Sequence, residues 1–234
     1  MYKEIVSYNL KKLGWFILLG YMIGFQYERA HWERGLMVAG ADEVGRGALA
    51  GPVVAATVVF APFNFKIPDR VSLVRDDSVR IDDSKQLTRL EREVADKWIR
   101  GNCLTFGIGE GSVAEINKFG IVLATNMAYR RAIAQMSHQT SHLLVDAFYI
   151  PYLRGIPRTR QTAIVKGDSV SFSIAAASII AKVYRDELMH RLACEHEQYY
   201  WGSNVGYGTK AHRDAIALYG LTPHHRSLFV RKFI

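Results

Sequence analysis

The sequence predicts an α/β domain built around a mixed β-sheet. Two strand-like apolar segments come early, at residues 37–41 and 52–60, and helical and strand-like segments alternate from residue 88 onward. The chain has 234 residues, of which 49% are hydrophobic, so one domain with a well-buried core is expected. The charged fraction of 22% is ordinary, so disorder is not expected.

The expected strands are short apolar runs, and the second, PVVAATVVF, is rich in β-branched residues. The five expected strands are residues 37–41, 52–60, 104–109, 142–146 and 163–166.

Helical segments are expected between and after these strands. Thr88 and Glu91 have the spacing of a capping box, which begins a helix, and Ser112 caps a shorter one. Gly220 ends the last helix. The expected helices are residues 88–100, a short helix from 112, and residues 121–136, 173–196 and 210–219.

The charge and cysteine content narrow the choice of partner and compartment. The formal net charge is +8, which favours a polyanionic partner such as nucleic acid, or an anionic membrane surface. Cys103 and Cys194 lie far apart, so they form neither a disulfide framework nor a metal-ligand spacing. We therefore expect a reducing, cytoplasmic environment.

The N-terminus carries an apolar run, GWFILLGYMIGF, preceded by lysines. This order resembles the start of a signal peptide, but no small-residue cleavage pattern follows. The run is also shorter than the roughly 20 residues that span a bilayer. We expect residues 1–24 to be a dispensable extension or an extra amphipathic helix, with translation from Met22 and a membrane anchor as alternatives. Residues 25–234 are expected to form the folded domain.

The sharpest local feature is Asp42-Glu43, which ends an apolar strand and is followed at once by Gly45-Arg46-Gly47. Carboxylates are the ligands that Mg²⁺ and Mn²⁺ prefer, and an arginine between glycines could meet a phosphate. Successive strand residues point to opposite faces, so both carboxylates share one site only at a strand end or an irregularity. Taken alone, the segment could equally be an acidic turn and a flexible loop.

Two further aspartates follow apolar runs, Asp146 in LLVD and Asp168 in VKGDS. Each could simply begin a turn. Together with the first pair, however, they place carboxylates after three strands, and sites in α/β sheets gather at strand ends. Such a group would repel itself unless cations were bound. The four candidate metal ligands are Asp42, Glu43, Asp146 and Asp168.

In combination, the motifs resemble the ribonuclease HII family over residues 25–229. The matching segments, in chain order, are AGADEVGRGALAGPVVAA, DDSKQLT, AEINKFGIVLAT, LLVDA, VKGDSVSFSIAAASIIAKVYRDELM, GYGT and HHRSLF.

The resemblance implies a ribonuclease H-like fold, with a five-stranded mixed sheet flanked by helices and a helical C-terminal part. It implies that the four carboxylates are the catalytic residues and hold Mn²⁺ or Mg²⁺. The Gly-Arg-Gly segment would contact the 2′-hydroxyl at the scissile ribonucleotide. Tyr207 would stack on the deoxyribose that follows, while Ser84 and Lys85 would approach the nucleic-acid backbone.

Other polar residues leave two interpretations open. Ser178 and Lys182 lie four residues apart on one helix face and could contact phosphate, but Lys182 could equally pair with Asp186. Asp186 is expected to be structural. The His-His-Arg segment at residues 224–226 could touch substrate or cap the C-terminal segment, and the structural role is favoured.

The implied activity is hydrolysis of the RNA strand of RNA–DNA hybrids, and cleavage 5′ of single ribonucleotides in duplex DNA. Two metals would activate a water and stabilise the leaving 3′-oxygen, giving 5′-phosphate and 3′-hydroxyl ends. No small-molecule cofactor and no membrane partner are expected, and the protein is expected to be a monomer. The rival hypotheses are another carboxylate-metal nuclease and a catalytically silent hybrid-binding module.

Overall fold

The computed structural model describes residues 23–62, 79–138 and 140–231. The expected N-terminal extension thus lies outside the described residues, except for Ile23 and Gly24. These two already contact the domain, because Ile23 is 9% exposed and the Gly24 carbonyl accepts a hydrogen bond from the Phe172 N–H, 2.9 Å away. Within the described ranges, no helix combines the length and apolar character needed to cross a membrane.

A five-stranded mixed sheet forms the centre of the protein, as predicted, with strand order β3-β2-β1-β4-β5. The pairings β1–β2 and β2–β3 are antiparallel, whereas β1–β4 and β4–β5 are parallel. The strands are β1 (Val38–Val44), β2 (Val53–Val59), β3 (Thr105–Gly111), β4 (His142–Asp146) and β5 (Gln161–Ile164).

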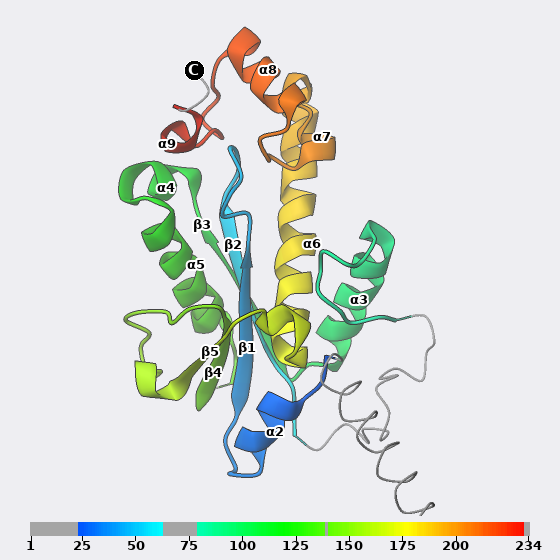
Figure 1. Cartoon of the computed structure of the whole chain (residues 1–234), viewed down its shortest axis with the longest axis vertical. Coiled ribbons are helices and arrows are strands. Elements are labelled where there is room, and N and C mark those ends of the chain that lie inside the picture. The colour runs from blue at the N-terminus through cyan, green and yellow to red at the C-terminus, as the bar shows by residue number, and fades with distance from the viewer. Residues whose placement is uncertain (1–22, 63–78, 139, 232–234) are drawn as a thin grey trace, which may run out of the picture.

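Helices cover both faces of this sheet (Figure 1). The helix α5 (Ile121–Gln135) packs on one face and the long α6 (Phe172–Glu195) on the other, where α3 (Arg89–Asn102) packs against α6. Every residue of β2 is buried. The strand can be apolar throughout because its alternate side chains enter cores on the two opposite faces.

The helix starts confirm the capping signals in the sequence. Thr88 and Glu91 form a complete capping box at α3, and Ser112 with Glu115 forms another at α4 (Val113–Phe119). The helix α8 (Lys210–Tyr219) ends before Gly220, whose φ of +78° suits glycine. Among the described residues, three further α-helices were not predicted: α2 (Gln26–Trp32), α7 (Trp201–Asn204) and α9 (Ser227–Val230).

The helix α2 is fixed to the start of α6 by a buried carboxylate. Glu28 is 1% exposed, and its Oε1 accepts hydrogen bonds from the Ser171 Oγ, the Ser173 N–H and the Ser173 Oγ. A negative charge at this position also complements the dipole at the N-terminus of α6.

The helix α6 lies unusually close to β1. A Cβ added at Gly40 would come within 2.4 Å of the Ser173–Ile174 backbone of α6, so only glycine permits this spacing. The close approach determines how far α6 stands from the acidic end of β1.

Candidate active site

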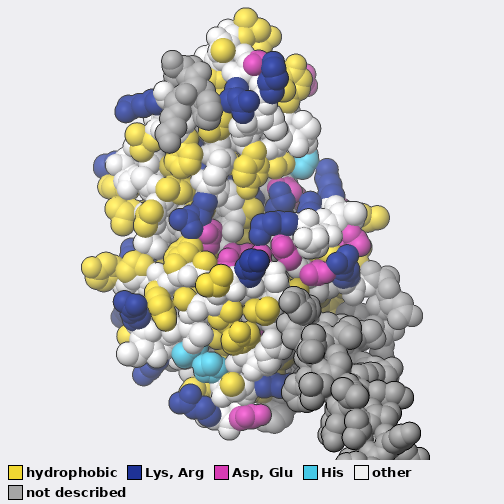
Figure 2. Space-filling view, in the orientation of Figure 1, with side chains coloured by type: hydrophobic (Ala, Val, Ile, Leu, Met, Phe, Trp, Pro, Cys, Tyr) yellow, Lys and Arg dark blue, Asp and Glu magenta, His cyan; other side chains and the backbone are white. Residues whose placement is uncertain are grey.

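The four carboxylates predicted as ligands come from three neighbouring strands. Asp42 and Glu43 lie in β1, Asp146 is the last residue of β4, and Asp168 lies in a 3-10 turn (Gly167–Ser169) after β5. The β1–β4 pairing extends only to Ala41, so β1 continues past the end of β4 at the two acidic residues. Figure 2 shows acidic side chains across the middle of one face, with Lys and Arg beside them.

Asp42 and Glu43 point to opposite faces of the sheet, as strand alternation requires. Asp42 is 6% exposed and accepts a hydrogen bond from Ser178 of α6. Glu43 instead accepts hydrogen bonds from the hydroxyl of Tyr129, on α5, and from Arg46, 3.1 Å away. The two carboxylates therefore lie on opposite faces of the sheet, beside the C-terminal end of β4.

The carboxylates raise one another's affinity for protons. Burial raises the pKa of Asp42 well above its usual value, and the charges of Glu43 and Asp146 add to this effect. Burial also raises the pKa of Glu43, opposed by the hydrogen bonds from Tyr129 and Arg46. The negative charges of the group are thus incompletely neutralised by the protein, and a bound cation would reduce their mutual repulsion.

Asp146 and Asp168 form the second half of the acidic group. The Asp146 Oδ1 accepts a hydrogen bond from the Gly167 N–H, 2.7 Å away, and Asp146 has its pKa raised by burial and by Asp168. Lys85 donates to the Asp168 Oδ2 at 2.9 Å and lies 3.6 Å from Asp83. Burial alone would lower the pKa of Lys85, but the hydrogen bond and charge of Asp168, together with the charges of Asp83 and Asp42, raise it.

In this arrangement no three His, Cys, Asp or Glu side chains of the described residues converge closely enough to hold an ion. Each carboxylate is held by a different neighbour: Ser178 holds Asp42, Tyr129 and Arg46 hold Glu43, the Gly167 N–H holds Asp146, and Lys85 holds Asp168. The donor set nevertheless fits a hard divalent cation, because all four groups are carboxylates and three of them have raised pKa values. Side-chain rotation would be required to bring them together.

Ser84 and Lys85 have different environments although they are adjacent. Ser84 is 4% exposed and shares a 2.9 Å hydrogen bond with Ser178, the residue that bonds Asp42. Ser84 thus reaches the site through Ser178, not through an exposed hydroxyl. The Lys85 side chain is 74% exposed, so it can still meet a substrate beside Asp168.

The Gly-Arg-Gly segment forms a loop directly after β1. Gly45 has a φ of +86°, and a Cβ there would lie 2.2 Å from the Arg185 Nε, so both backbone and space require glycine. Gly47 is exposed, and nothing lies within 4 Å of where its Cβ would be. The Arg46 guanidinium lies 4.9 Å from the ring centroid of Phe148, in addition to its contact with Glu43. The loop therefore presents open backbone beside the carboxylates.

Two buried arginines connect this loop to the loop of Tyr207. Arg185 and Arg226 are each 0% exposed. Arg185 donates to the carbonyls of Ala50, Pro52 and Val205, and Arg226 donates to those of Gly51 and Arg46.

Tyr207 itself packs against this connection. The Arg185 Cζ lies 5.5 Å from the Tyr207 ring centroid, and the Gly206 carbonyl accepts hydrogen bonds from Leu49 and Ala50. The Gly-Arg-Gly loop and the Tyr207 loop are consequently one bonded unit.

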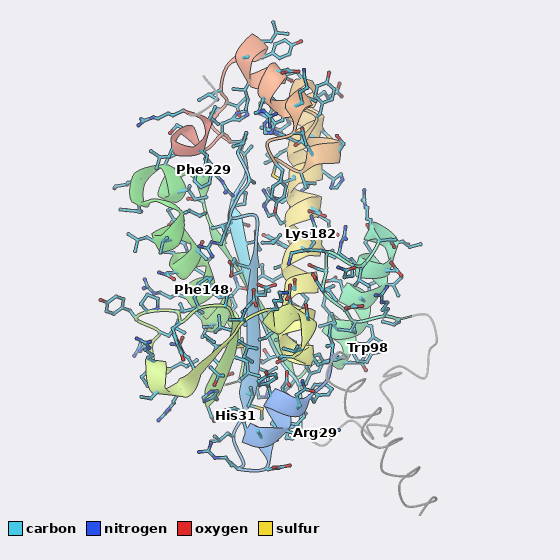
Figure 3. The ribbon with its side chains drawn as sticks, viewed as in Figure 1. Arg29, His31, Trp98, Phe148, Lys182 and Phe229 are labelled. Carbon is cyan, nitrogen blue, oxygen red and sulfur yellow. The ribbon has the colours of Figure 1, made fainter. Side chains whose placement is uncertain are left out.

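The remaining polar residues considered in the sequence have structural contacts. Lys182 donates to the Asp186 Oδ1 at 2.8 Å, and Asp186 also lies 3.8 Å from Arg92. Figure 3 shows Lys182 on α6 and Phe148 on the opposite side of β1. Arg226 is buried, which confirms the structural interpretation of that segment.

The sequence did not single out Tyr129, Phe148 or Arg185. Each acts through tertiary contacts for which the sequence carries no local signal. Tyr129 lies on an ordinary helical face, and Arg185 is indistinguishable in sequence from an exposed helical arginine.

The solved structures of similar shape define the class of fold. The ribonuclease H2 of Pyrococcus horikoshii superimposes with a TM-score of 0.66 at 24% identity, over 85% of this chain and 97% of that one. Ribonuclease HII of Archaeoglobus fulgidus, solved in complex with PCNA, gives a TM-score of 0.62 at 26% identity, over 82% and 94%. The chain thus has the α/β fold of type 2 ribonucleases H.

Sequence comparison then identifies the family to which the chain belongs. The profile of ribonuclease HII matches residues 39–233. Ribonuclease HII of Thermosynechococcus vestitus is 44% identical over 209 residues, covering 89% of this chain and 91% of that protein. Ribonuclease HII of a Wolbachia from Brugia malayi is 46% identical over 193 residues, covering 82% and 87%. The chain belongs to the ribonuclease HII family, and it is a hydrolytic endoribonuclease.

Proposed function

We propose that the chain hydrolyses the RNA strand of RNA–DNA hybrids and also cuts 5′ of single ribonucleotides embedded in duplex DNA. The products would carry 5′-phosphate and 3′-hydroxyl ends. Family membership supports the activity on hybrids. The observation that carries the finer substrate is the bonded unit of the Gly-Arg-Gly and Tyr207 loops beside the carboxylates.

Asp42, Glu43, Asp146 and Asp168 are proposed to hold Mn²⁺ or Mg²⁺. Two such ions, when bound, would supply activation of a water and charge stabilisation at the leaving 3′-oxygen. The protein's own part is to hold the carboxylates close to that position. Ser178 orients Asp42, and the Gly167 N–H orients Asp146.

Lys85 is proposed to contact a phosphate of the nucleic-acid backbone beside Asp168. It donates to Asp168 from a largely exposed position, so its ammonium group can also reach a bound strand. Ser84 is proposed to support Asp42 through Ser178.

Two loops are proposed to recognise the ribose and the sugar that follows it. Gly45, Arg46 and Gly47 would contact the 2′-hydroxyl, since the open backbone at Gly47 allows a sugar to approach closely. Tyr207 would stack on the deoxyribose that follows. Because Arg185 bonds both loops, these two contacts would keep a fixed spacing.

Cleavage of a DNA duplex that carries one ribonucleotide, with and without Mn²⁺ or Mg²⁺, tests the proposal. We expect metal-dependent cutting immediately 5′ of the ribonucleotide and none in an all-DNA duplex. Cutting of the all-DNA duplex would instead support a different carboxylate-metal nuclease. Binding of hybrids without any cleavage would support a silent binding module.

A further inference from the structure

The connection between β4 and β5, residues 147–160, forms a basic and aromatic surface that leads from Asp146, at the C-terminal end of β4, to the N-terminal end of the parallel strand β5. It begins directly after Asp146 and lies on the α5 side of the sheet (Figure 1). We call it the arginine–tyrosine surface, and its members are Arg130, Tyr149, Tyr152, Arg154, Arg158 and Arg160.

The positive charge of this surface is not neutralised within the described part of the chain. The connection holds three arginines and no Asp or Glu. None of these arginines, nor Arg130 of α5, forms an ion pair with a described carboxylate. Arg130 donates instead to the Pro151 carbonyl at 3.0 Å, which fixes the connection to α5. Such a surface attracts an anionic partner.

Two tyrosine side chains of this surface are exposed to solvent beside its arginines. Tyr152 is 90% exposed, and its φ of +57° is a conformation that non-glycine residues rarely adopt. The Arg130 Cζ lies 5.9 Å from its ring centroid. Tyr149 is 42% exposed, with the Arg158 Cζ at 4.6 Å from its ring. Exposed aromatic rings flanked by guanidinium groups are the elements that stack unpaired bases.

The surface also encloses a hollow large enough for a nucleotide. Its volume is about 690 Å³, and its lining contains no carboxylate. Arg130, Tyr152, Arg154 and Arg160 line it together with the hydroxyls of Ser137 and Thr140. Arginine and hydroxyl donors are the usual partners of phosphate oxygens.

We propose that the arginine–tyrosine surface binds an unpaired nucleic-acid strand that continues from the cleaved duplex. A base would stack on Tyr152, and the backbone phosphates would meet Arg154 and Arg160. The inference rests on the proposed function, because the strand belongs to the nucleic acid that the carboxylates cut. It adds a second contact region for substrates with single-stranded extensions.

Fluorescence anisotropy on the full chain in EDTA tests this proposal with two probes. The first is a duplex with one ribonucleotide and blunt ends, and the second is the same duplex with ten-nucleotide single-stranded extensions, a length chosen for roughly one binding site. We expect the extended duplex to bind about tenfold tighter. Tyr152→Ala should remove this advantage, whereas Tyr152→Phe, which keeps a ring to stack, should retain it. An equal Kd for both probes, or an unchanged advantage in Tyr152→Ala, would overturn the proposal.

The phosphate contacts have a separate readout in salt. Each phosphate contact on a single strand contributes about 0.7 to the slope of log Kd against log salt. Arg154→Ala/Arg160→Ala should therefore lower the slope for the extended duplex by about 1.4, and for the blunt duplex not at all. Arg89→Ala on α3, outside the surface, serves as the matched control and should change neither slope. Equal slopes in the double variant and the control would contradict the assignment.

Cleavage of the blunt duplex distinguishes this inference from the proposed function. If the wild-type chain cuts the blunt duplex and the surface variants do so equally well, only binding of the extension is in question. If the wild-type chain cuts neither duplex, the proposed function fails, while binding of an unpaired DNA 20-mer still reports on the surface. Binding of polyglutamate as tight as that of the 20-mer would overturn the choice of nucleic acid as partner.

Discussion

Replacing Glu28 with alanine would remove the buried carboxylate that joins α2 to the start of α6. Three donors from Ser171 and Ser173 would lose their acceptor at once. Hydrogen bonds to charged groups contribute about 1.5–3 kcal/mol each, but the variant also escapes the cost of burying a carboxylate, a cost that appears as the raised pKa of Glu28. By analogy with breaking other buried charged networks, we expect the free energy of unfolding to fall by about 3–5 kcal/mol.

Urea unfolding followed by circular dichroism measures this loss. With a slope of about 2 kcal/mol per molar urea, the midpoint should fall by roughly 2 M. Glu28→Gln is the matched control, because its amide oxygen can still accept while its nitrogen replaces Oε2, an atom without a hydrogen-bond partner among the described residues. We expect about half the loss for this variant. An alanine variant within 1 kcal/mol of wild type, at an unchanged slope, would refute the proposed role of Glu28.

Asp42→Asn and Asp146→Asn should each abolish cleavage while leaving the circular dichroism spectrum intact; near-wild-type turnover in saturating Mg²⁺ would remove that residue from the site. Tyr207→Ala should reduce cutting at an embedded ribonucleotide more than cutting of long hybrids, and an equal loss on both substrates would contradict the stacking role. Deleting residues 1–21 should leave specificity and melting temperature unchanged, and a fall of many degrees would show that the segment packs on the domain. Burial lowers the pKa of His225 from 6.5 to about 4, so only the unfolded chain gains this proton as the pH falls from 6.5. The contribution of His225 to the free energy of unfolding should therefore fall by up to about 3 kcal/mol between pH 6.5 and 4, and the difference in stability between the wild-type chain and His225→Gln should change by this amount in urea titrations.

The sheet and the long helices could be predicted because their signals are local. The β-branched run of β2 and the capping boxes at Thr88 and Ser112 act within a few residues. The helix α2 was missed for the opposite reason. It has no side-chain cap, and Glu28 and Phe25 hold it through contacts with residues near position 172.

For the candidate site, strand ends gave the positions of the carboxylates but not their directions. Alternation along β1 sends Asp42 and Glu43 to different faces, and the sequence does not reveal which helix each one meets. The buried arginines were the hardest feature to foresee. Arginine is rarely fully buried, so nothing near Arg185 or Arg226 distinguishes either residue from a solvated one.

The two arginines also set the charge beneath the substrate-facing loops. Neither forms an ion pair with a described carboxylate. Burial and the charge of Arg185 lower the pKa of Arg226 only to about 9, and a guanidinium group stays protonated in proteins, so both arginines are cationic at neutral pH. Two charges are therefore fixed beneath the loops at Gly45 and Tyr207, where dissolved salt screens them less than it screens surface lysines. Fixed positive charge at this position favours the approach of a polyanion. The two guanidinium groups that position the loops thus also place positive charge beneath them.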